Sequence, residues 1–154
     1  MKVIDNFLEQ DKFNFFKKEI TGEYFPWYFN NQKVIDDNHL DNFQFVHTFT
    51  NGSTALPLLD VFKEKLNVNN FTRAKLNCTT RTSKIFEFKL HNDLEKNCKV
   101  SIFYVNSNNG YTQFETGEKV ESIENRLVTF DNKIKHFGTT SINSQTRIVL
   151  NMCY

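Results

Sequence analysis

The first seventy residues contain two segments whose apolar residues recur at helical spacing. The first helix is expected to begin at Asp11, whose side chain can cap it, and to end before Gly22. Its apolar face would consist of Phe13, Phe15, Phe16 and Ile20. The second helix is expected over residues 55–66, with Pro57 tolerated in the first turn and Asn67 as the stop. Its apolar stripe would consist of Leu58, Leu59, Phe62 and Leu66.

Elsewhere the hydrophobic pattern changes to the period of two that is typical of strands. The expected strands are residues 24–29, 43–49, 71–78, 85–90, 99–105, 111–115, 119–123, 126–130 and 146–153. Polar turns separate the later strands, and no helix-like segment lies between them. This order is typical of an antiparallel sandwich or jelly roll. We therefore expect a mainly β (α+β) single domain over residues 1–154, with a helix-rich part at 1–70 packed on one sheet and a jelly-roll core at 71–154.

The composition of the chain indicates what its core consists of and which binding partners are not favoured. The 17 phenylalanines predict a core built from large rings on sheet faces. A net charge of +1 and the lack of a dense Lys/Arg stripe do not favour nucleic-acid binding. The sequence has no run of 18 apolar residues and no signal-peptide pattern at its start. We expect a cytoplasmic protein that does not bind membranes, and the sequence leaves its oligomeric state open.

The cysteines Cys78, Cys98 and Cys153 are odd in number and widely spaced, without a CxxC pair. This pattern predicts free thiols in a reducing compartment rather than disulfides or a zinc site.

The segment His91-Asn92-Asp93 contains two candidate metal ligands. In extended backbone, positions two apart point the same way, so His91 and Asp93 can reach one ion. His136 could supply a second imidazole, and two histidines with one carboxylate form the facial triad of non-haem Fe(II) oxygenases. A His-x-Asp segment alone is a weak signal, because such residues are often solvated, and a histidine near a strand is more often structural.

Arg147 stands among apolar residues in the last expected strand. A buried arginine needs a partner, which could be a nearby glutamate or the carboxylate of a ligand. The residue pattern leaves both alternatives open.

The stretch from Phe88 to Leu150 resembles the catalytic core of 2-oxoglutarate- and Fe(II)-dependent dioxygenases, in particular the prolyl 4-hydroxylase-like branch. The matching motifs stand in family order: HND at 91–93, FYVN at 103–106, GYT at 110–112, NRLVTF at 125–130, His136, and Thr146-Arg147. Upstream, the segments at 25–28, 45–47 and 73–77 are similar to small hydroxylase-like proteins of phages, which would place the chain in a host cytoplasm.

The resemblance implies a double-stranded β-helix in which His91, Asp93 and His136 bind Fe(II). It also implies that Arg147 binds the distal carboxylate of 2-oxoglutarate as a bidentate fork and that Tyr104 donates its hydroxyl to the same carboxylate. A family tyrosine near the metal-side carboxylate corresponds here to Asn77, which departs from the pattern. Asn151 shares the strand face of Arg147 and could also reach the cosubstrate.

The activity that the resemblance implies is hydroxylation of an unactivated C–H bond with O2 as co-reactant; ascorbate is compatible as an accessory cofactor. Because halogenating relatives lack the carboxylate, Asp93 favours hydroxylation. The family-level substrate is a prolyl residue of a peptide; another protein side chain, a free amino acid or a nucleobase stays open. Two other classes also stay open: a non-catalytic jelly-roll module, and a cupin-type metal-dependent isomerase, which would not need Arg147 or Tyr104.

Four residues outside this set are expected to be structural. His39 and His47 would be surface or half-buried residues, Trp27 a core or rim anchor, and Arg126 a partner in a structural ion pair.

Overall fold

The structure is a computed structural model that describes residues 1–32, 40–50 and 53–154. The described chain forms two antiparallel sheets. The larger has the strand order β1-β8-β5-β10-β4-β3-β2, and the smaller has the order β7-β6-β9. The strands are β1 (Lys2–Ile4), β2 (Tyr28–Asn30), β3 (Gln44–Thr48), β4 (Arg73–Thr80), β5 (Lys99–Tyr104), β6 (Tyr111–Phe114), β7 (Lys119–Glu121), β8 (Arg126–Asp131), β9 (His136–Gly138) and β10 (Thr146–Cys153). The helical segments are α1 (Gln10–Ile20), the short 3₁₀ helix η1 (Leu56–Leu59) and α2 (Asp60–Leu66).

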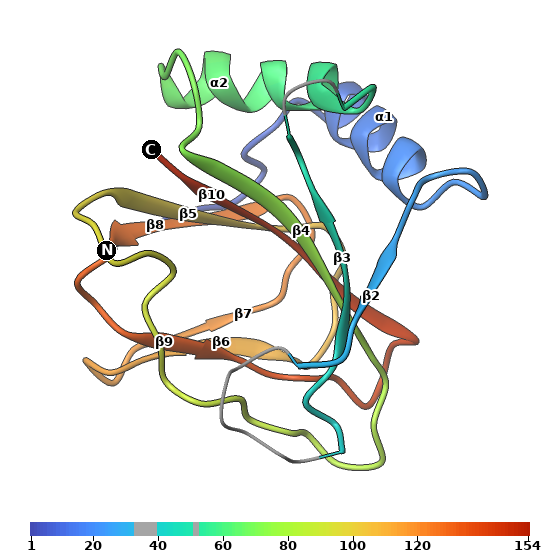
Figure 1. The fold of residues 1–154 in the computed structure, drawn as a ribbon, viewed down its shortest axis with the longest axis vertical. Helices are drawn as coiled ribbons and strands as arrows, with labels where there is room; N and C mark the ends of the chain where they lie inside the picture. Colours follow the sequence, from blue (N-terminus) through green and yellow to red (C-terminus); the bar gives the residue numbers. More distant parts are fainter. Residues whose placement is uncertain (33–39, 51–52) are drawn as a thin grey trace.

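Three layers result, as Figure 1 shows: the helices cover one face of the larger sheet, and the smaller sheet lies across its other face. The mainly β class with helices packed on one sheet is therefore as expected. Strands β1, β2 and β3, all from the first seventy residues, join the same sheet as the later strands. None of the described helices is long and apolar enough to cross a membrane.

Phenylalanine rings fill the space between the helices and the larger sheet. Phe103 of β5 lies 4.9 Å, centroid to centroid, from Phe62 of α2 and 6.1 Å from both Phe13 and Phe16 of α1. Leu76, Leu150 and Met152 complete this side of the sheet and are fully buried. Their neighbours in sequence face the other way, because successive side chains of a strand alternate between faces.

The space between the two sheets is divided between a second apolar core and a polar cavity. Val100, Phe114 and Phe130 belong to this smaller core. On the same face of the larger sheet, β4 and β10 contribute polar residues instead: Arg73, Lys75 and Asn77 from β4, and Arg147 and Asn151 from β10. Alternate side chains of β4 and β10 are therefore apolar and buried under the helices, and most of those between them are polar or charged and face the cavity.

The helix expectations hold with three corrections. Helix α1 begins at Gln10 with Glu9 as N-cap, so Asp11 lies in the first turn instead of capping the helix. Phe15 is 60% exposed and does not belong to the apolar face. The second helix is divided into η1 and α2, with Pro57 near the beginning of η1. Asn67 ends α2 with a left-handed backbone (φ 53°), as expected for a C-terminal stop.

Among the strands, the expectation for residues 85–90 was wrong. This segment forms one isolated bridge, between Glu87 and Thr139, and the next bridge joins His91 to His136 just after it. Three residues, 88–90, separate the two bridges on one side but only two, 137–138, on the other, so an extra residue bulges out and no continuous ladder can form.

Other strand bounds also differ from the sequence pattern. The expected strand at 24–29 is reduced to Tyr28–Asn30, because residues 22–25 form a turn in which the Phe25 amide donates to the Gly22 carbonyl. Strands β1 and β9 were not expected. Each has three residues, which is too short for a visible alternation.

Candidate functional site

A cavity of about 450 Å³ lies between the two sheets and contains the polar residues described above. This volume lies within the range of small-molecule sites in proteins. Its walls come from β3, β4, β5 and β10 of the larger sheet, from β6 and β9 of the smaller sheet, and from the segment at 91–93. The cavity therefore collects side chains that are far apart in the sequence.

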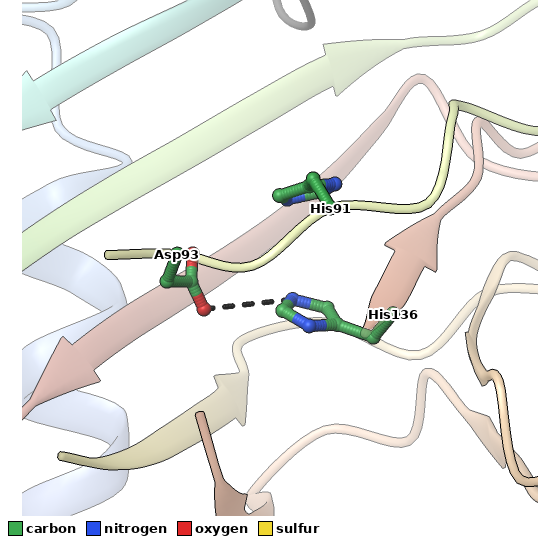
Figure 2. A group of neighbouring side chains, drawn as sticks. All are labelled: His91, Asp93 and His136. Atoms are coloured by element: carbon green, nitrogen blue, oxygen red, sulfur yellow. Dashed lines mark ion pairs between the residues drawn. The ribbon is translucent and has the colours of Figure 1, made fainter. Parts of the chain in front are cut away.

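His91, Asp93 and His136 meet at one end of this cavity. Each offers a ligand atom, and these atoms all lie within 4.8 Å of one another. The isolated bridge aligns the two histidines: the His91 amide donates to the His136 carbonyl at 3.0 Å, and the reverse bond is 3.1 Å. Figure 2 shows His91 and Asp93 on one loop and His136 at the start of β9, with Asp93 facing His136. The fold thus brings together the three residues of the expected triad.

One oxygen of Asp93 is held firmly by neighbouring side chains. Its Oδ1 accepts hydrogen bonds from the Arg73 guanidinium at 2.7 Å and from Nδ2 of Asn151 at 2.9 Å. A second Arg73 nitrogen donates to the Asp93 carbonyl oxygen at 3.0 Å. Burial on its own raises the pKa of the Asp93 carboxyl, but the charge of His136, the Asn151 hydrogen bond and the Arg73 charge outweigh it and lower the pKa. Asp93 is therefore held as a carboxylate.

The remaining atoms of the triad suit a divalent metal. Oδ2 of Asp93 is buried without a hydrogen-bond partner among the described residues, and it faces Nε2 of His136 at 3.5 Å. Nδ1 of His91 lies 3.0 Å from the Lys89 carbonyl oxygen. A carbonyl only accepts, so this contact assigns the proton to Nδ1 and leaves Nε2 of His91 as a lone-pair donor. Two imidazoles and one carboxylate suit Fe(II) and leave coordination positions open.

Arg147 lies at the other end of the cavity and is only 3% exposed. Its Nε donates to the Ser122 hydroxyl at 2.8 Å, and a terminal nitrogen donates to the Thr112 hydroxyl at 3.1 Å. No carboxylate of the described residues forms an ion pair with it, so the structure shows no glutamate partner. Burial lowers the pKa of Arg147, and the nearby Tyr104 opposes this shift. A cation that is buried against hydroxyl groups alone is well placed to bind an anion.

The other expected cosubstrate residues occupy three different positions. Tyr104 is fully buried behind Arg147, where its hydroxyl donates to the Thr112 hydroxyl at 2.8 Å and its ring lies 5.7 Å from the guanidinium carbon. Asn77 lines the cavity between the two ends. Asn151 lines it too, but its amide is engaged with Asp93.

Several cavity residues were not singled out as site residues in the sequence. Arg73 holds Asp93, Thr112 accepts from both Tyr104 and Arg147, and Lys75 lines the wall of β4. A signal for the β4 residues was available: in Arg73-Ala74-Lys75-Leu76-Asn77 the polar residues alternate with apolar ones, which predicts one polar face on an otherwise buried strand.

The residues that were expected to be structural lie away from the triad. His47 is buried at 5% exposure, which corrects the expectation of a surface or half-buried residue, and its Nδ1 lies 3.0 Å from the Pro26 carbonyl oxygen. Trp27 donates to the Ile20 carbonyl, and Arg126 pairs with Asp5 at 2.5 Å. His39 lies outside the described residues.

Comparison with family models and with curated proteins finds no match. Solved structures do match over almost the whole chain. A prolyl hydroxylase from Trichoplax adhaerens, in complex with a peptide fragment of the hypoxia inducible factor oxygen degradation domain, has a TM-score of 0.74 at 12% identity, with 99% of this chain and 82% of that chain covered.

Two further hydroxylases are similar. The viral collagen prolyl hydroxylase of Paramecium Bursaria Chlorella virus-1, in its 2-oxoglutarate complex, has a TM-score of 0.66 at 13% identity, covering 99% of this chain and 93% of that chain. A Pseudomonas putida prolyl-4-hydroxylase has a TM-score of 0.59 at 11% identity, covering 99% and 90%. At such identities the likeness concerns the fold, and this chain has the fold of these prolyl hydroxylases.

Proposed function

We propose that this chain is an Fe(II)- and 2-oxoglutarate-dependent oxygenase with a double-stranded β-helix core, and that it hydroxylates an unactivated C–H bond. The observation that carries the proposal is the pairing of two features in one cavity. A His₂Asp cluster lies at one end, and at the other lies a buried guanidinium that forms no ion pair with a carboxylate of the described residues. A metal chelator that carries a second carboxylate satisfies both ends at once.

The spacing along β10 supports a dicarboxylate of this size. Arg147 and Asn151 point to the same face of the strand, and four residues of strand span about 13 Å between α-carbons. Asn151 contacts Asp93, so this strand links the metal end to the cation end. A span of this length leaves room for a five-carbon dicarboxylate between the two ends.

In this proposal His91, Asp93 and His136 hold Fe(II), and the bound metal with its cosubstrate supplies the oxidising chemistry that activates O2. Arg73 and Asn151 orient Asp93 so that Oδ2 faces the metal position. Arg147 neutralises the distal carboxylate of 2-oxoglutarate, while Tyr104 supports it directly or through Thr112. Asn77 lies between the ends and is placed to contact the middle of the cosubstrate.

We further propose that residues 1–154 act as one domain and that the substrate is a peptide or a small molecule. The similar Trichoplax adhaerens enzyme was solved with a peptide, which supports a prolyl or other peptidyl substrate. A cupin-type isomerase would need the metal ligands but not a buried cation, and a non-catalytic module would need neither. Arg147 therefore separates the oxygenase from both alternatives.

An anaerobic titration tests the proposal. Fe(II) followed by 2-oxoglutarate should produce a weak visible charge-transfer band with one equivalent of each. Succinate, which cannot chelate through a keto group, serves as the control and should produce no band. Metal binding without a band on addition of 2-oxoglutarate would favour the isomerase, and the lack of metal binding would favour the non-catalytic module.

A further inference from the structure

Lys75 is a cation of the cavity that the proposed chemistry does not use. It is the third residue of β4, its side chain lines the cavity wall, and it is half-buried. Arg73 is engaged with Asp93, and Arg147 is assigned to the cosubstrate. The ammonium of Lys75, by contrast, forms no hydrogen bond or ion pair within the described ranges 1–32, 40–50 and 53–154.

The charges of the cavity leave an excess of positive charge. Among the residues that the structure describes, three cationic side chains, Arg73, Lys75 and Arg147, line it together with one carboxylate, that of Asp93. A divalent metal and a dicarboxylate cancel each other, so the loaded site keeps this excess. Burial lowers the pKa of Lys75, with the Arg73 charge in the same direction and Asp93 opposed. Burial and a neighbouring positive charge both disfavour the charged form of Lys75, so an anion that binds beside the ammonium stabilises that form.

The register of the sheet places Lys75 at the metal end of the cavity. Lys75 pairs with Asn151 across β4 and β10, and the Asn151 amide donates a hydrogen bond to Asp93. Arg147, at the other end, pairs with Thr79, four residues farther along β4. On its other side Lys75 pairs with Thr48 of β3, which is exposed. Lys75 therefore lies at the metal end of the cavity, next to an exposed residue of the neighbouring strand.

We infer that Lys75 binds a carboxylate of the substrate, so that the group to be hydroxylated lies close to a carboxylate in the same molecule. This inference rests on the proposed function and adds the substrate class to it. The carboxylate can come from two sources: the α-carboxylate of a free amino acid, or the acidic side chain of a residue next to the target residue in a peptide. Lys75 is thus a specificity-determining residue rather than a catalytic one.

Matched acid and amide pairs test the inference. A panel of free L-amino acids, including L-proline, is compared with their α-amides, and short proline peptides with a neighbouring glutamate are compared with their glutamine forms. Substrate-dependent succinate formation measures kcat/KM for each member. We expect wild type to favour the acid member of its substrate pair about tenfold or more, and the active arm of the panel identifies the source.

Variants of Lys75 link the preference to this side chain. Lys75→Gln should reduce the acid-to-amide ratio to about one, Lys75→Glu should invert it, and Lys75→Arg should retain most of it. Lys99→Gln is the control, because Lys99 is an exposed strand residue outside the cavity. The anaerobic charge-transfer band and the 2-oxoglutarate affinity should stay within about twofold of wild type in Lys75→Gln and Lys75→Arg, which also shows that these variants are folded.

The outcomes separate the inference from the proposed function. If wild type forms no charge-transfer band, the oxygenase proposal fails. If the band forms but amide members are the better substrates, or no carboxylate-bearing member is turned over, the inference about Lys75 alone fails. It also fails if Lys75→Gln weakens 2-oxoglutarate binding as strongly as loss of Arg147 does, because Lys75 would then bind the cosubstrate.

Discussion

At the scale of single residues, the chain uses histidine in two different ways. His91 is half-buried in a loop, and its ring faces His136 with 4.9 Å between the ring centres. His47 is buried among aromatic rings, with centroids 4.6 Å from Phe25 and 4.8 Å from Phe49. The first environment presents a nitrogen to a cavity, whereas the second uses the ring for packing.

Substitution by alanine should separate these two uses. His91→Ala should abolish micromolar Fe(II) binding and change the free energy of unfolding by less than about 1 kcal/mol, because little packing is lost. His47→Ala should leave Fe(II) binding unchanged and lower the free energy of unfolding by about 1–3 kcal/mol, because it leaves a cavity among aromatic rings. Metal titration and urea unfolding of both variants measure these effects. Equal iron affinity in wild type and His91→Ala would remove His91 from the site.

Arg147 and Tyr104 should differ in their effects on cosubstrate affinity. Arg147→Leu removes a charge-assisted pair from a buried site, which costs about 2–4 kcal/mol, or roughly 30- to 1000-fold in 2-oxoglutarate affinity. Tyr104→Phe removes one neutral donor, whose hydroxyl contacts Thr112, and should cost about 1 kcal/mol. Both variants should retain the metal. Anaerobic calorimetry with Mn(II) bound measures the two affinities, and small, equal effects would mean that Arg147 does not bind the cosubstrate.

At the scale of elements, the turn before β6 determines how Arg147 is placed. Gly110 packs directly against it: a β-carbon there would lie 2.6 Å from Cδ of Arg147 and 2.7 Å from the Thr140 carbonyl oxygen. Both distances are too short for any side chain, and the carbonyl belongs to the backbone and cannot easily move. The glycine of the GYT motif is therefore explained by close packing around the buried cation.

Gly110→Ala should displace Arg147 and weaken 2-oxoglutarate binding about tenfold or more, together with a loss of about 1–3 kcal/mol in the free energy of unfolding. Gly117→Ala is the matched control. Gly117 has φ +97° and nothing within 4 Å of the added carbon, so strain should reduce stability without changing cosubstrate affinity. Thermal unfolding and cosubstrate titration of both variants test this difference, and an unchanged affinity in Gly110→Ala would contradict it.

At the scale of the whole molecule, the burial of the cysteines depends on how closely the layers pack. All three are free, as expected; Cys78 and Cys153 are buried, and Cys98 is half-buried. Burial raises the pKa of Cys78 to about 11. Burial, together with the charge of Asp93, raises the pKa of Cys153 to about 12. At pH 8 both residues are therefore almost entirely in the unreactive thiol form.

Thiol labelling of the folded protein at pH 8 should therefore modify Cys98 first, while Cys78 and Cys153 react at least about a hundredfold more slowly. All three should label at similar rates in denaturant. Mass spectrometry over time measures the order, and Cys98→Ser should remove the fast phase. A fast phase that includes Cys78 would show that the sheet opens beneath the helices more often than its packing implies.

The local pattern was sufficient to predict much of the molecule. Helix α1 and strand β10 follow from their own periodicity, because a helix or strand that covers a core must repeat its apolar residues at 3.6 or 2 positions. The same alternation placed Arg147 and Asn151 on one face. The spacing of His91 and Asp93 was likewise sufficient to suggest that they share a direction.

The tertiary structure decided what lies across from each face. Residues 85–90 alternate like a strand, but the bulge opposite β9 prevents a ladder, and strand register depends on a partner that is distant in sequence. Long-range pairing also determines which residues surround Asp93 and places Lys75 at the metal end. It likewise leaves Arg147 without a carboxylate partner within the described chain. Periodicity determines which way a side chain points, whereas only the closed fold determines the charges that it meets.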